Sequence, residues 1–188
     1  MQIEHFDISG PLLIRPRRFE DRRGWFSESW SRRALADVGL DVDFVQDNVS
    51  VSFAAGVLRG LHCQVPPFAQ GKLIQVFTGA LRDVAVDVRE GSPTFGHHLI
   101  CDLSEDDPAQ IWIPPGFIHG FVTMRANTRV MYKASAFYSR EHERAVAWND
   151  PDLAIDWGVR APILSSKDAA AARLKDQPGL FPVGAFND

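Results

Sequence analysis

The central part of the chain alternates apolar and polar residues in short runs that turn residues separate. Between residues 73 and 138 these runs are LIQVFT, LRDVAVDVR, HHLICDL, IWIPP, HGFVTM and RVMYKASAFY. In RDVAVDVR three valines alternate with Asp83, Asp87 and Arg89, which predicts a half-buried antiparallel strand with a polar outer face. Gly and Pro recur between the runs, which favours an all-β fold over alternating β-α units. We therefore predict a jelly-roll barrel of two antiparallel sheets.

Helix signals are confined to the flanks of this strand-rich region. SRRALADVGL at 31–40 ends in a suitable C-terminal Gly39, and SSKDAAAARLKD at 165–176 joins a serine start to an alanine run. No repeat or linker divides the 188 residues, so we expect residues 1–188 to form a single jelly-roll domain with N-terminal and C-terminal arms. The region after residue 150 is expected to wrap the barrel.

Composition and charge exclude several classes of function. Apolar residues make up 45% of the chain, charged residues 23%, and the net charge is −4, so we predict no general affinity for nucleic acid or anionic membranes. The N-terminus lacks a basic start followed by an apolar run, and Pro and Gly break the longest uncharged stretch, so neither a signal peptide nor a membrane span is predicted. Two cysteines, Cys63 and Cys101, are too few for a disulfide framework, and we expect a cytoplasmic location.

Two motifs are similar to the metal-binding motifs of cupin barrels, but they lack metal ligands. G-x5-H ends at His62 and P-x-G-x2-H ends at His119, while Gln64 stands where a metal-binding cupin repeats a histidine. Two imidazoles and an amide fall short of the three good donors that a zinc or iron site needs. We therefore predict a cupin-like barrel with no metal and no cofactor. A metal-dependent cupin oxygenase would require a third ligand.

Longer motifs resemble a known family. The stretches at 56–96, 111–121, 130–157 and 162–168, among them GVLRGLHCQ, IWIPPGFIHGF and PILSSKD, closely resemble the dTDP-4-dehydrorhamnose 3,5-epimerase family over nearly the whole chain. The resemblance implies a metal-free jelly-roll homodimer. It also implies an isomerase that inverts C3 and C5 of dTDP-4-keto-6-deoxy-D-glucose, a nucleotide sugar, to give dTDP-4-keto-L-rhamnose.

Inversion of a carbon beside a ketone needs a base, a group that holds the enolate oxygen, and an acid on the opposite face. His62 is the candidate base, because imidazole has a pKa of about 6.5. The resemblance implies that Asp168 orients His62, that Lys72 faces the enolate and that Tyr132 is the acid. Each has a structural alternative. Asp168 fits a capping box that starts at Ser165, Lys72 a solvated strand end, and Tyr132 a core position.

Candidate substrate contacts include one feature that stands out in the sequence. Residues 15–23, RPRRFEDRR, hold five arginines, which are typical of solvated surface but whose guanidinium groups also fit diphosphate oxygens. Here the resemblance singles out Arg23, Glu28 and, as a stacking ring for thymine, Phe19, and it implies that this region reaches the partner subunit. Arg59, three residues before His62, is expected to anchor a phosphate beside the base. Other contacts implied are Gln46, Asn48, Tyr138, Glu143 and Lys167. His119 is implied as a donor to the sugar ring or its keto oxygen, with a purely structural role in the turn as the alternative.

Departures from the family pattern leave the substrate open. Cys63 stands where an aromatic residue is commoner, and Ala172 where a proline often occurs. A smaller side chain beside His62 could enlarge the pocket for a related 4-keto sugar. The alternatives are an epimerase that inverts C3 only and a non-catalytic nucleotide-sugar binding cupin. The presence of Tyr132 favours double inversion, and a binding protein has no reason to keep His62, Lys72 and Tyr132 together.

Overall fold

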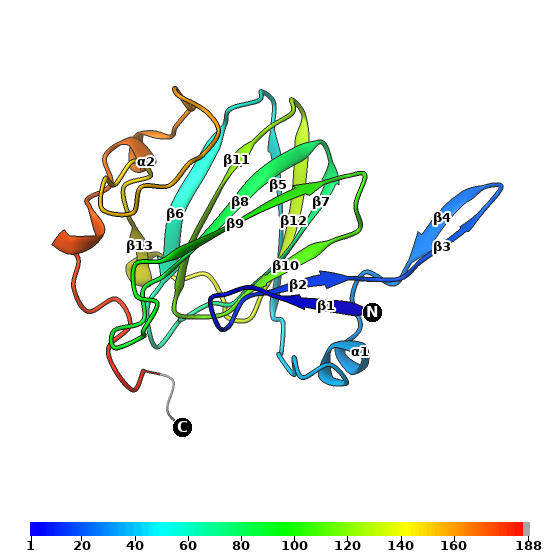
Figure 1. The fold of residues 1–188 in the computed structure, drawn as a ribbon, viewed down its shortest axis with the longest axis horizontal. Helices are drawn as coiled ribbons and strands as arrows, with labels where there is room; N and C mark the ends of the chain where they lie inside the picture. The colour runs from blue at the N-terminus through cyan, green and yellow to red at the C-terminus, as the bar shows by residue number, and fades with distance from the viewer. Residues whose placement is uncertain (186–188) are drawn as a thin grey trace.

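The computed structural model describes residues 1–185, and strands make up most of it (Figure 1). The strands form two antiparallel sheets around a shared apolar interior. The first sheet has six strands in the order β1 (Gln2–His5), β2 (Leu12–Arg15), β10 (Gln110–Ile113), β7 (Lys72–Thr78), β12 (Thr128–Ala134) and β5 (Gln46–Ser52).

The second sheet carries both histidine motifs. Its five strands lie in the order β13 (Glu143–Ala145), β6 (Leu58–Gln64), β11 (Phe117–Thr123), β8 (Ala80–Asp87) and β9 (His98–Ser104). Within residues 1–185 no strand pairing joins the two sheets, so the predicted jelly-roll of two antiparallel sheets is confirmed as an open sandwich and not as a closed barrel. A separate hairpin of β3 (Arg18–Asp21) and β4 (Gly24–Ser27) projects away from both sheets (Figure 1).

Strand β8 contributes to two apolar clusters, one on each of its faces. Leu81 and Ala85 face the interior and join a cluster that includes Ile111 from the other sheet. The three valines of RDVAVDVR face outward and pack with Trp157 and Phe181 of the C-terminal segment. The segment after residue 150 thus packs on the outer face of the five-stranded sheet.

The prediction that β8 is half-buried with a polar face in solvent is wrong. Asp83 and Asp87 are both 0% exposed, because their face of the strand points between the sheets. Burial of an ionised carboxylate destabilises the fold unless charged or hydrogen-bonding groups pair with it. Asp83 has such a partner in His119, and Asp87 has one in Arg89. The alternation correctly predicts a strand, but its polar face points to the interior.

Both predicted helices are much shorter than expected. Helix α1 is Arg32–Ala36 and helix α2 is Ser166–Ala169, with 3₁₀ turns at Arg140–His142 (η1) and Leu174–Asp176 (η2). Serines cap both α-helices, as the sequence indicated. After α2, however, Ala172 accepts a hydrogen bond from the backbone N–H of Ala147 at 2.8 Å, and Leu174 donates to Asp150 at 2.8 Å. The chain thus bonds to the body of the protein instead of continuing the helix.

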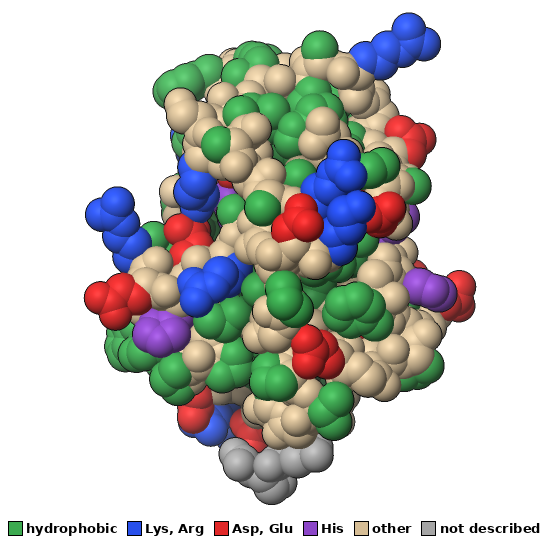
Figure 2. All heavy atoms as spheres, turned by 90° about the vertical axis from the view of Figure 1, so that its left-hand side faces the viewer, with side chains coloured by type: hydrophobic (Ala, Val, Ile, Leu, Met, Phe, Trp, Pro, Cys, Tyr) green, Lys and Arg blue, Asp and Glu red, His purple; other side chains and the backbone are tan. Residues whose placement is uncertain are grey.

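The side of the molecule that carries the C-terminal segment has a mixed surface. Figure 2 shows basic and acidic side chains interspersed there with apolar ones, without a patch of one sign. No helix in the described part of the chain is long and apolar enough to cross a membrane.

The Asp87 carboxylate organises the turn between β8 and β9. Its Oδ1 accepts hydrogen bonds from the backbone N–H and Nε of Arg89, at 3.0 and 2.9 Å. Its Oδ2 accepts from Ser92 Oγ at 2.6 Å and from Thr94 Oγ1 at 2.7 Å. Burial opposes ionisation of Asp87, but these donors outweigh it and lower the pKa to about 2. The ionised carboxylate therefore stabilises the fold.

We expect this network to make the fold sensitive to acid. The contribution of Asp87 is fully present above its unfolded pKa of about 3.9 and is lost as the pH falls through its folded pKa of about 2. The loss should reach roughly 2–3 kcal/mol in the free energy of unfolding, since one pKa unit corresponds to about 1.4 kcal/mol. Urea unfolding of the wild type and of Asp87→Asn at several pH values tests this. Equal pH dependence of the two proteins below pH 5 would contradict it.

Candidate active site

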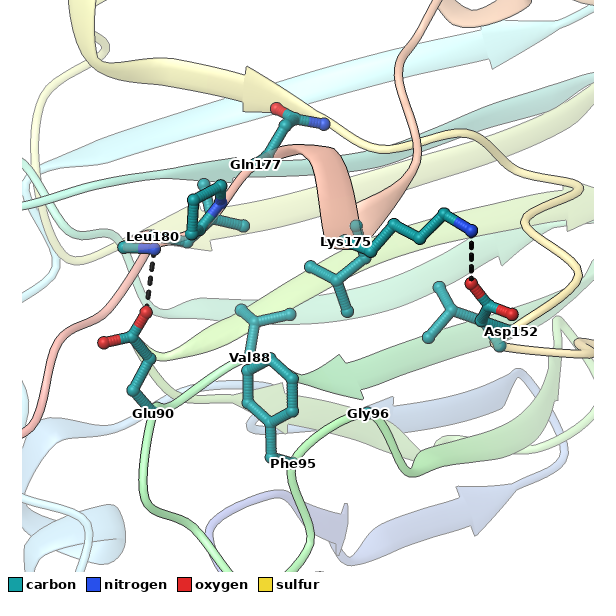
Figure 3. A pocket seen from close by; sticks show the side chains of 12 residues that line it. Val88, Glu90, Phe95, Gly96, Asp152, Lys175, Gln177 and Leu180 are labelled. Atoms are coloured by element: carbon teal, nitrogen blue, oxygen red, sulfur yellow. Dashed lines mark hydrogen bonds and ion pairs between the residues drawn. The ribbon is translucent and has the colours of Figure 1, made fainter.

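Among the cavities of residues 1–185, two have nearly the same volume but different chemistry. One of about 310 Å³ lies between the β8–β9 turn and the C-terminal segment, and apolar side chains such as Val88 and Phe95 line it (Figure 3). Its charged groups already have partners. Lys175 pairs with Asp152 at 3.4 Å, and Glu90 accepts a backbone N–H at 2.8 Å. Nothing in this cavity is arranged for acid-base chemistry.

The second cavity, of about 300 Å³, receives side chains from both sheets and from the segment around α2. It brings together all four predicted catalytic residues and three of the predicted substrate contacts. Its lining consists of Ser50, Arg59, His62, Lys72, Ile74, His119, Phe121, Tyr132, Ser165, Lys167 and Asp168.

His62 and Asp168 form a close pair in this cavity. His62 Nε2 lies 2.5 Å from Asp168 Oδ1. Ser165 Oγ donates to Asp168 Oδ2 at 2.8 Å and accepts from the Asp168 backbone N–H at 3.1 Å, so the carboxylate is fixed by the helix cap that it also helps to form. Asp168 therefore occupies both positions that the sequence allowed. Burial lowers the pKa of His62 below its usual value, although the charge of Asp168 opposes this, so the ring is neutral near pH 7.

A β-bulge places Arg59 and His62 on the same face of β6. Residues three apart on a regular strand point to opposite faces. Here His119 pairs with His62 and Phe121 pairs with Arg59, so three steps along β6 correspond to two along β11. The extra residue at Gly60 restores the alternation, and both side chains line the cavity. The expected placement of Arg59 beside His62 depends on this bulge.

Only glycine fits at the bulge. Gly60 has φ +129°, and a Cβ there would lie 2.5 Å from the Cα of Gly120 and 2.8 Å from the backbone oxygen of His119. Both distances are well inside van der Waals contact. The two glycines thus let β6 and β11 approach closely beneath the cavity.

His119 also has an aspartate partner, which sequence reasoning missed. Its Nε2 lies 2.9 Å from Asp83 Oδ2, and both side chains are buried. The prediction treated Asp83 as solvent-facing, although its position on the face of β8 opposite the valines was the available signal. With Nε2 bonded to Asp83, only Nδ1 of His119 is left for a ligand.

Lys72 and Tyr132 meet the cavity from the six-stranded sheet. Among residues 1–185, neither the Lys72 ammonium nor the Tyr132 hydroxyl has a hydrogen bond to another side chain or to the backbone. Burial lowers the pKa of Lys72. Burial also raises the pKa of Tyr132, against the influence of Arg59, so this phenol keeps its proton at neutral pH. The solvated alternative does not describe Lys72, whose side chain lines the cavity. Tyr132 lines the cavity and also packs against the interior apolar cluster, so the core alternative describes it in part.

Five predicted contact residues form one hydrogen-bonded chain that starts at the cavity. Lys167 Nζ lies 2.8 Å from Glu143 Oε1, and Tyr138 donates its hydroxyl to Glu143 Oε2 at 3.2 Å. The Tyr138 backbone N–H donates to Gln46 at 3.1 Å, and Gln46 Nε2 donates to Asn48 at 2.9 Å. Burial opposes ionisation of Glu143, but the bond with Lys167 outweighs it and lowers the pKa. Glu143 is therefore ionised.

Three predicted contacts lie away from the cavity of their own chain. Phe19 and Arg23 belong to the β3–β4 hairpin, and Glu28 follows it directly. No residue of the hairpin lines the cavity. Arg23 instead bonds Asp21 at 2.6 Å, and Arg17 stacks over the Phe19 ring at 4.7 Å. The structure of one chain does not bring these residues to His62.

Cys63 does not line the cavity, so the suggestion that its small side chain enlarges the pocket is wrong. It follows His62 on the strand and points to the opposite face, where it packs with Leu58 and Val86. Among the residues that the structure describes, no three His, Cys, Asp or Glu side chains cluster in a way that could hold a metal ion. Sequence reasoning also missed part of the lining, namely Ser50, Ile74, Phe121 and Ser165.

Comparison with known proteins gives consistent matches over most of the chain. The sequence profile of the dTDP-4-dehydrorhamnose 3,5-epimerase family matches residues 5–176. A dTDP-4-dehydrorhamnose 3,5-epimerase from Sinorhizobium fredii is 48% identical over 96% of this chain and 93% of its own. The structure of dTDP-6-deoxy-D-glucose-3,5-epimerase from Legionella pneumophila in complex with dTDP-4-keto-L-rhamnose is 42% identical, with a TM-score of 0.90 over 96% of this chain and 97% of that one. A 3′-monoepimerase from Streptomyces bikiniensis in complex with dTDP-quinovose is 32% identical, with a TM-score of 0.88 over 94% of this chain and 91% of that one.

We predict that Gly60→Ala destabilises the fold far more than strain in the backbone alone would. Gly24 provides a matched control, because its φ of +131° is close to that of Gly60 at +129° but a Cβ there meets no atom within 4 Å. Gly24→Ala should cost roughly 1–3 kcal/mol, the usual range for such backbone conformations. Gly60→Ala should cost about 2 kcal/mol more, because β6 and β11 must separate. Urea unfolding measures both, and equal losses would show that the close approach has no energetic importance.

Proposed function

We propose that this chain, which belongs to the dTDP-4-dehydrorhamnose 3,5-epimerase family, inverts C3 and C5 of dTDP-4-keto-6-deoxy-D-glucose to give dTDP-4-keto-L-rhamnose. The observation that carries this proposal is the 2.5 Å pair of His62 and Asp168 in one cavity with Lys72 and Tyr132. The 4-keto group makes the hydrogens on both neighbouring carbons acidic. Proton removal and return at each carbon is all the chemistry that inversion needs.

His62 acts as the base. With Nε2 held by Asp168, the lone pair of the neutral ring is on Nδ1. After His62 takes a proton, the Asp168 carboxylate stabilises the imidazolium. Asp168 is 4% exposed, so water competes little for this interaction.

Tyr132 acts as the acid on the opposite face of the sugar. It comes from β12 of the six-stranded sheet, whereas His62 comes from β6 of the five-stranded sheet. A sugar held between the sheets therefore has the base on one side and the acid on the other. This arrangement supports inversion, because the returning proton arrives from the face opposite to the one that lost it.

Lys72 stabilises the enolate. Its ammonium lines the cavity and has no ion pair within residues 1–185, so a developing negative charge on the keto oxygen gives it a partner. Burial lowers the pKa of this lysine, and the enolate charge acts in the opposite direction. Lys72 is thus better matched to the charge-separated transition state than to the free site.

Arg59, His119 and the chain from Lys167 to Asn48 bind the nucleotide sugar, and a homodimer completes the site. Phe19, Arg23 and Glu28 lie on or beside a hairpin that projects from its own subunit, so they contact substrate in the cavity of the partner (Figure 1). Both cysteines are buried free thiols, which fits a reducing compartment such as the cytoplasm.

Turnover in deuterated water tests the reaction. We expect incubation with dTDP-4-keto-6-deoxy-D-glucose to place deuterium at both C3 and C5, as followed by NMR. His62→Ala should lower exchange at both carbons by about 100-fold or more, the loss typical of a missing general base. In Tyr132→Phe, exchange into recovered substrate should exceed inversion, because proton return is impaired more than removal.

Each other outcome of this experiment excludes part of the proposal. Label at C3 alone would identify a monoepimerase. The absence of label from a folded wild-type protein would exclude the enzyme and favour a nucleotide-sugar binding protein. Unchanged exchange in His62→Ala would show that another group is the base.

Mixing two inactive variants tests the shared site. If the hairpin serves the partner, a heterodimer of His62→Ala and Arg23→Ala subunits has one complete site, formed by His62 of one chain and Arg23 of the other. Random exchange of subunits should then restore about a quarter of wild-type activity per dimer. Sedimentation confirms the dimer, and mixed Arg23→Ala and Arg59→Ala subunits give a second test of the same pairing. Recovery in neither mixture would place Arg23 in its own subunit's site.

A further inference from the structure

Ser50 is the cavity residue whose polar group has no role so far. Its Oγ is buried and has no hydrogen-bond partner among residues 1–185, and the residue lines the same cavity as His62 and Tyr132. A buried hydroxyl without a partner destabilises a folded protein, so such a group in a cavity indicates that a ligand supplies the partner.

The other inward-facing residues of β5 all have hydrogen-bond partners, which sets Ser50 apart from them. Even-numbered residues of β5 face inward and all four are polar. Gln46 and Asn48 bond each other at 2.9 Å, and Ser52 accepts from Arg59 Nε at 3.4 Å. Ser50 lies between these two bonded groups and alone has no bond.

The strand register places Ser50 between two parts of the site. On β12, Tyr132 pairs with Asn48 and Val130 pairs with Ser50, so the Ser50 side chain is diagonal to that of Tyr132. On its other side, the Arg59 guanidinium donates to Ser52 and to the backbone oxygen of Val51, at 3.4 and 3.3 Å. Ser50 therefore lies on β5 between the residues that bind the Arg59 guanidinium and the residue that pairs with Tyr132, and all three side chains line the cavity.

We propose that Ser50 binds the substrate by donating its hydroxyl hydrogen to an oxygen of the sugar-bearing phosphate, beside Arg59. A hydroxyl and a guanidinium side by side are both donors, and an anionic oxygen accepts from both. This assignment rests on the proposed function, since that gives Arg59 a phosphate to bind. It adds a contact that links the diphosphate end of the substrate to the end where Tyr132 acts.

The proposal makes Ser50→Ala weaken binding without weakening the fold. We expect the Kd for dTDP, measured by calorimetry, to rise about tenfold or more, because hydrogen bonds to charged groups are the strong ones. The KM for the dTDP-linked sugar should rise by a similar factor. In the absence of ligand the melting temperature should stay equal or rise, since the substitution removes a buried hydroxyl without a partner.

Ser104→Ala is the matched control. Ser104 ends β9, away from the cavity, and its Oγ accepts the Asp106 N–H at 3.3 Å. This variant should keep the wild-type Kd for dTDP and lose a little stability. Ser50→Ala should thus lose affinity for dTDP and keep its stability, whereas Ser104→Ala should keep its affinity and lose a little stability.

Three results would overturn the assignment of Ser50. A lower melting temperature for Ser50→Ala would mean that its hydroxyl supports the fold. An unchanged Kd for dTDP together with a raised KM would move the contact to the sugar. Wild-type values for both would leave Ser50 without a role in binding while the proposed function stands. If the wild-type protein neither binds dTDP nor turns over the sugar, the proposed function fails and this inference fails with it.

Discussion

The hydrogen bond between His62 and Asp168 joins parts of the chain that are 106 residues apart, and the rest of the site depends on it. Helix α2 has only four residues and cannot hold Asp168 in place by itself. Before the helix, Ile163 bonds the backbone at Gly56, at 2.8 Å, and after it Ala172 bonds Ala147. The C-terminal segment is thus hydrogen-bonded to the body of the protein on both sides of Asp168. Its packing on the outer valines of β8 therefore positions the carboxylate to which the proposed mechanism assigns a role.

Burial shifts the pKa values of three cavity groups in the same way, toward the neutral form. It disfavours the charged form of every group, so the pKa values of His62 and Lys72 are lowered and that of Tyr132 is raised. The free site therefore holds a base that can accept a proton and an acid that can donate one. Lys72 also has no ion pair within residues 1–185. In the proposed reaction, the enolate supplies the counter-charge when it forms.

Strand alternation, a local pattern, predicted much of the fold, and the family resemblance supplied most of the site residues. What failed depends on the tertiary structure. Alternation shows that Asp83 and Asp87 share a face, but only the packing of the second sheet decides that the face is interior. The helix expected at 165–176 ends early because its backbone bonds Ala147, which no local pattern reveals.

The sequence pattern also could not predict that Arg59 and His62 share one face of β6. Three residues on a strand predict opposite faces, and the bulge that reverses this is visible only as a pair of distant glycines, Gly60 and Gly120. The prediction placed Arg59 beside His62 because only three residues separate them, although this spacing on a regular strand gives the opposite result. The structure supplies the reason for the two glycines, because the close contact of two backbones leaves no room for a side chain at either position.

Buried polar atoms without hydrogen-bond partners lower the free energy of unfolding, and in this protein they lie in two places. Within residues 1–185 there are four such side-chain atoms: Ser50 Oγ, Asp83 Oδ1, Ser27 Oγ and Arg18 Nε. Ser50 lines the cavity, and Asp83 is the hydrogen-bond partner of His119, which also lines it. Ser27 and Arg18 belong to the β3–β4 hairpin. None of the four lies in the apolar clusters or in the C-terminal segment. Unsatisfied groups cost free energy wherever they occur, so their restriction to these two places is expected if bound substrate and a second subunit complete them.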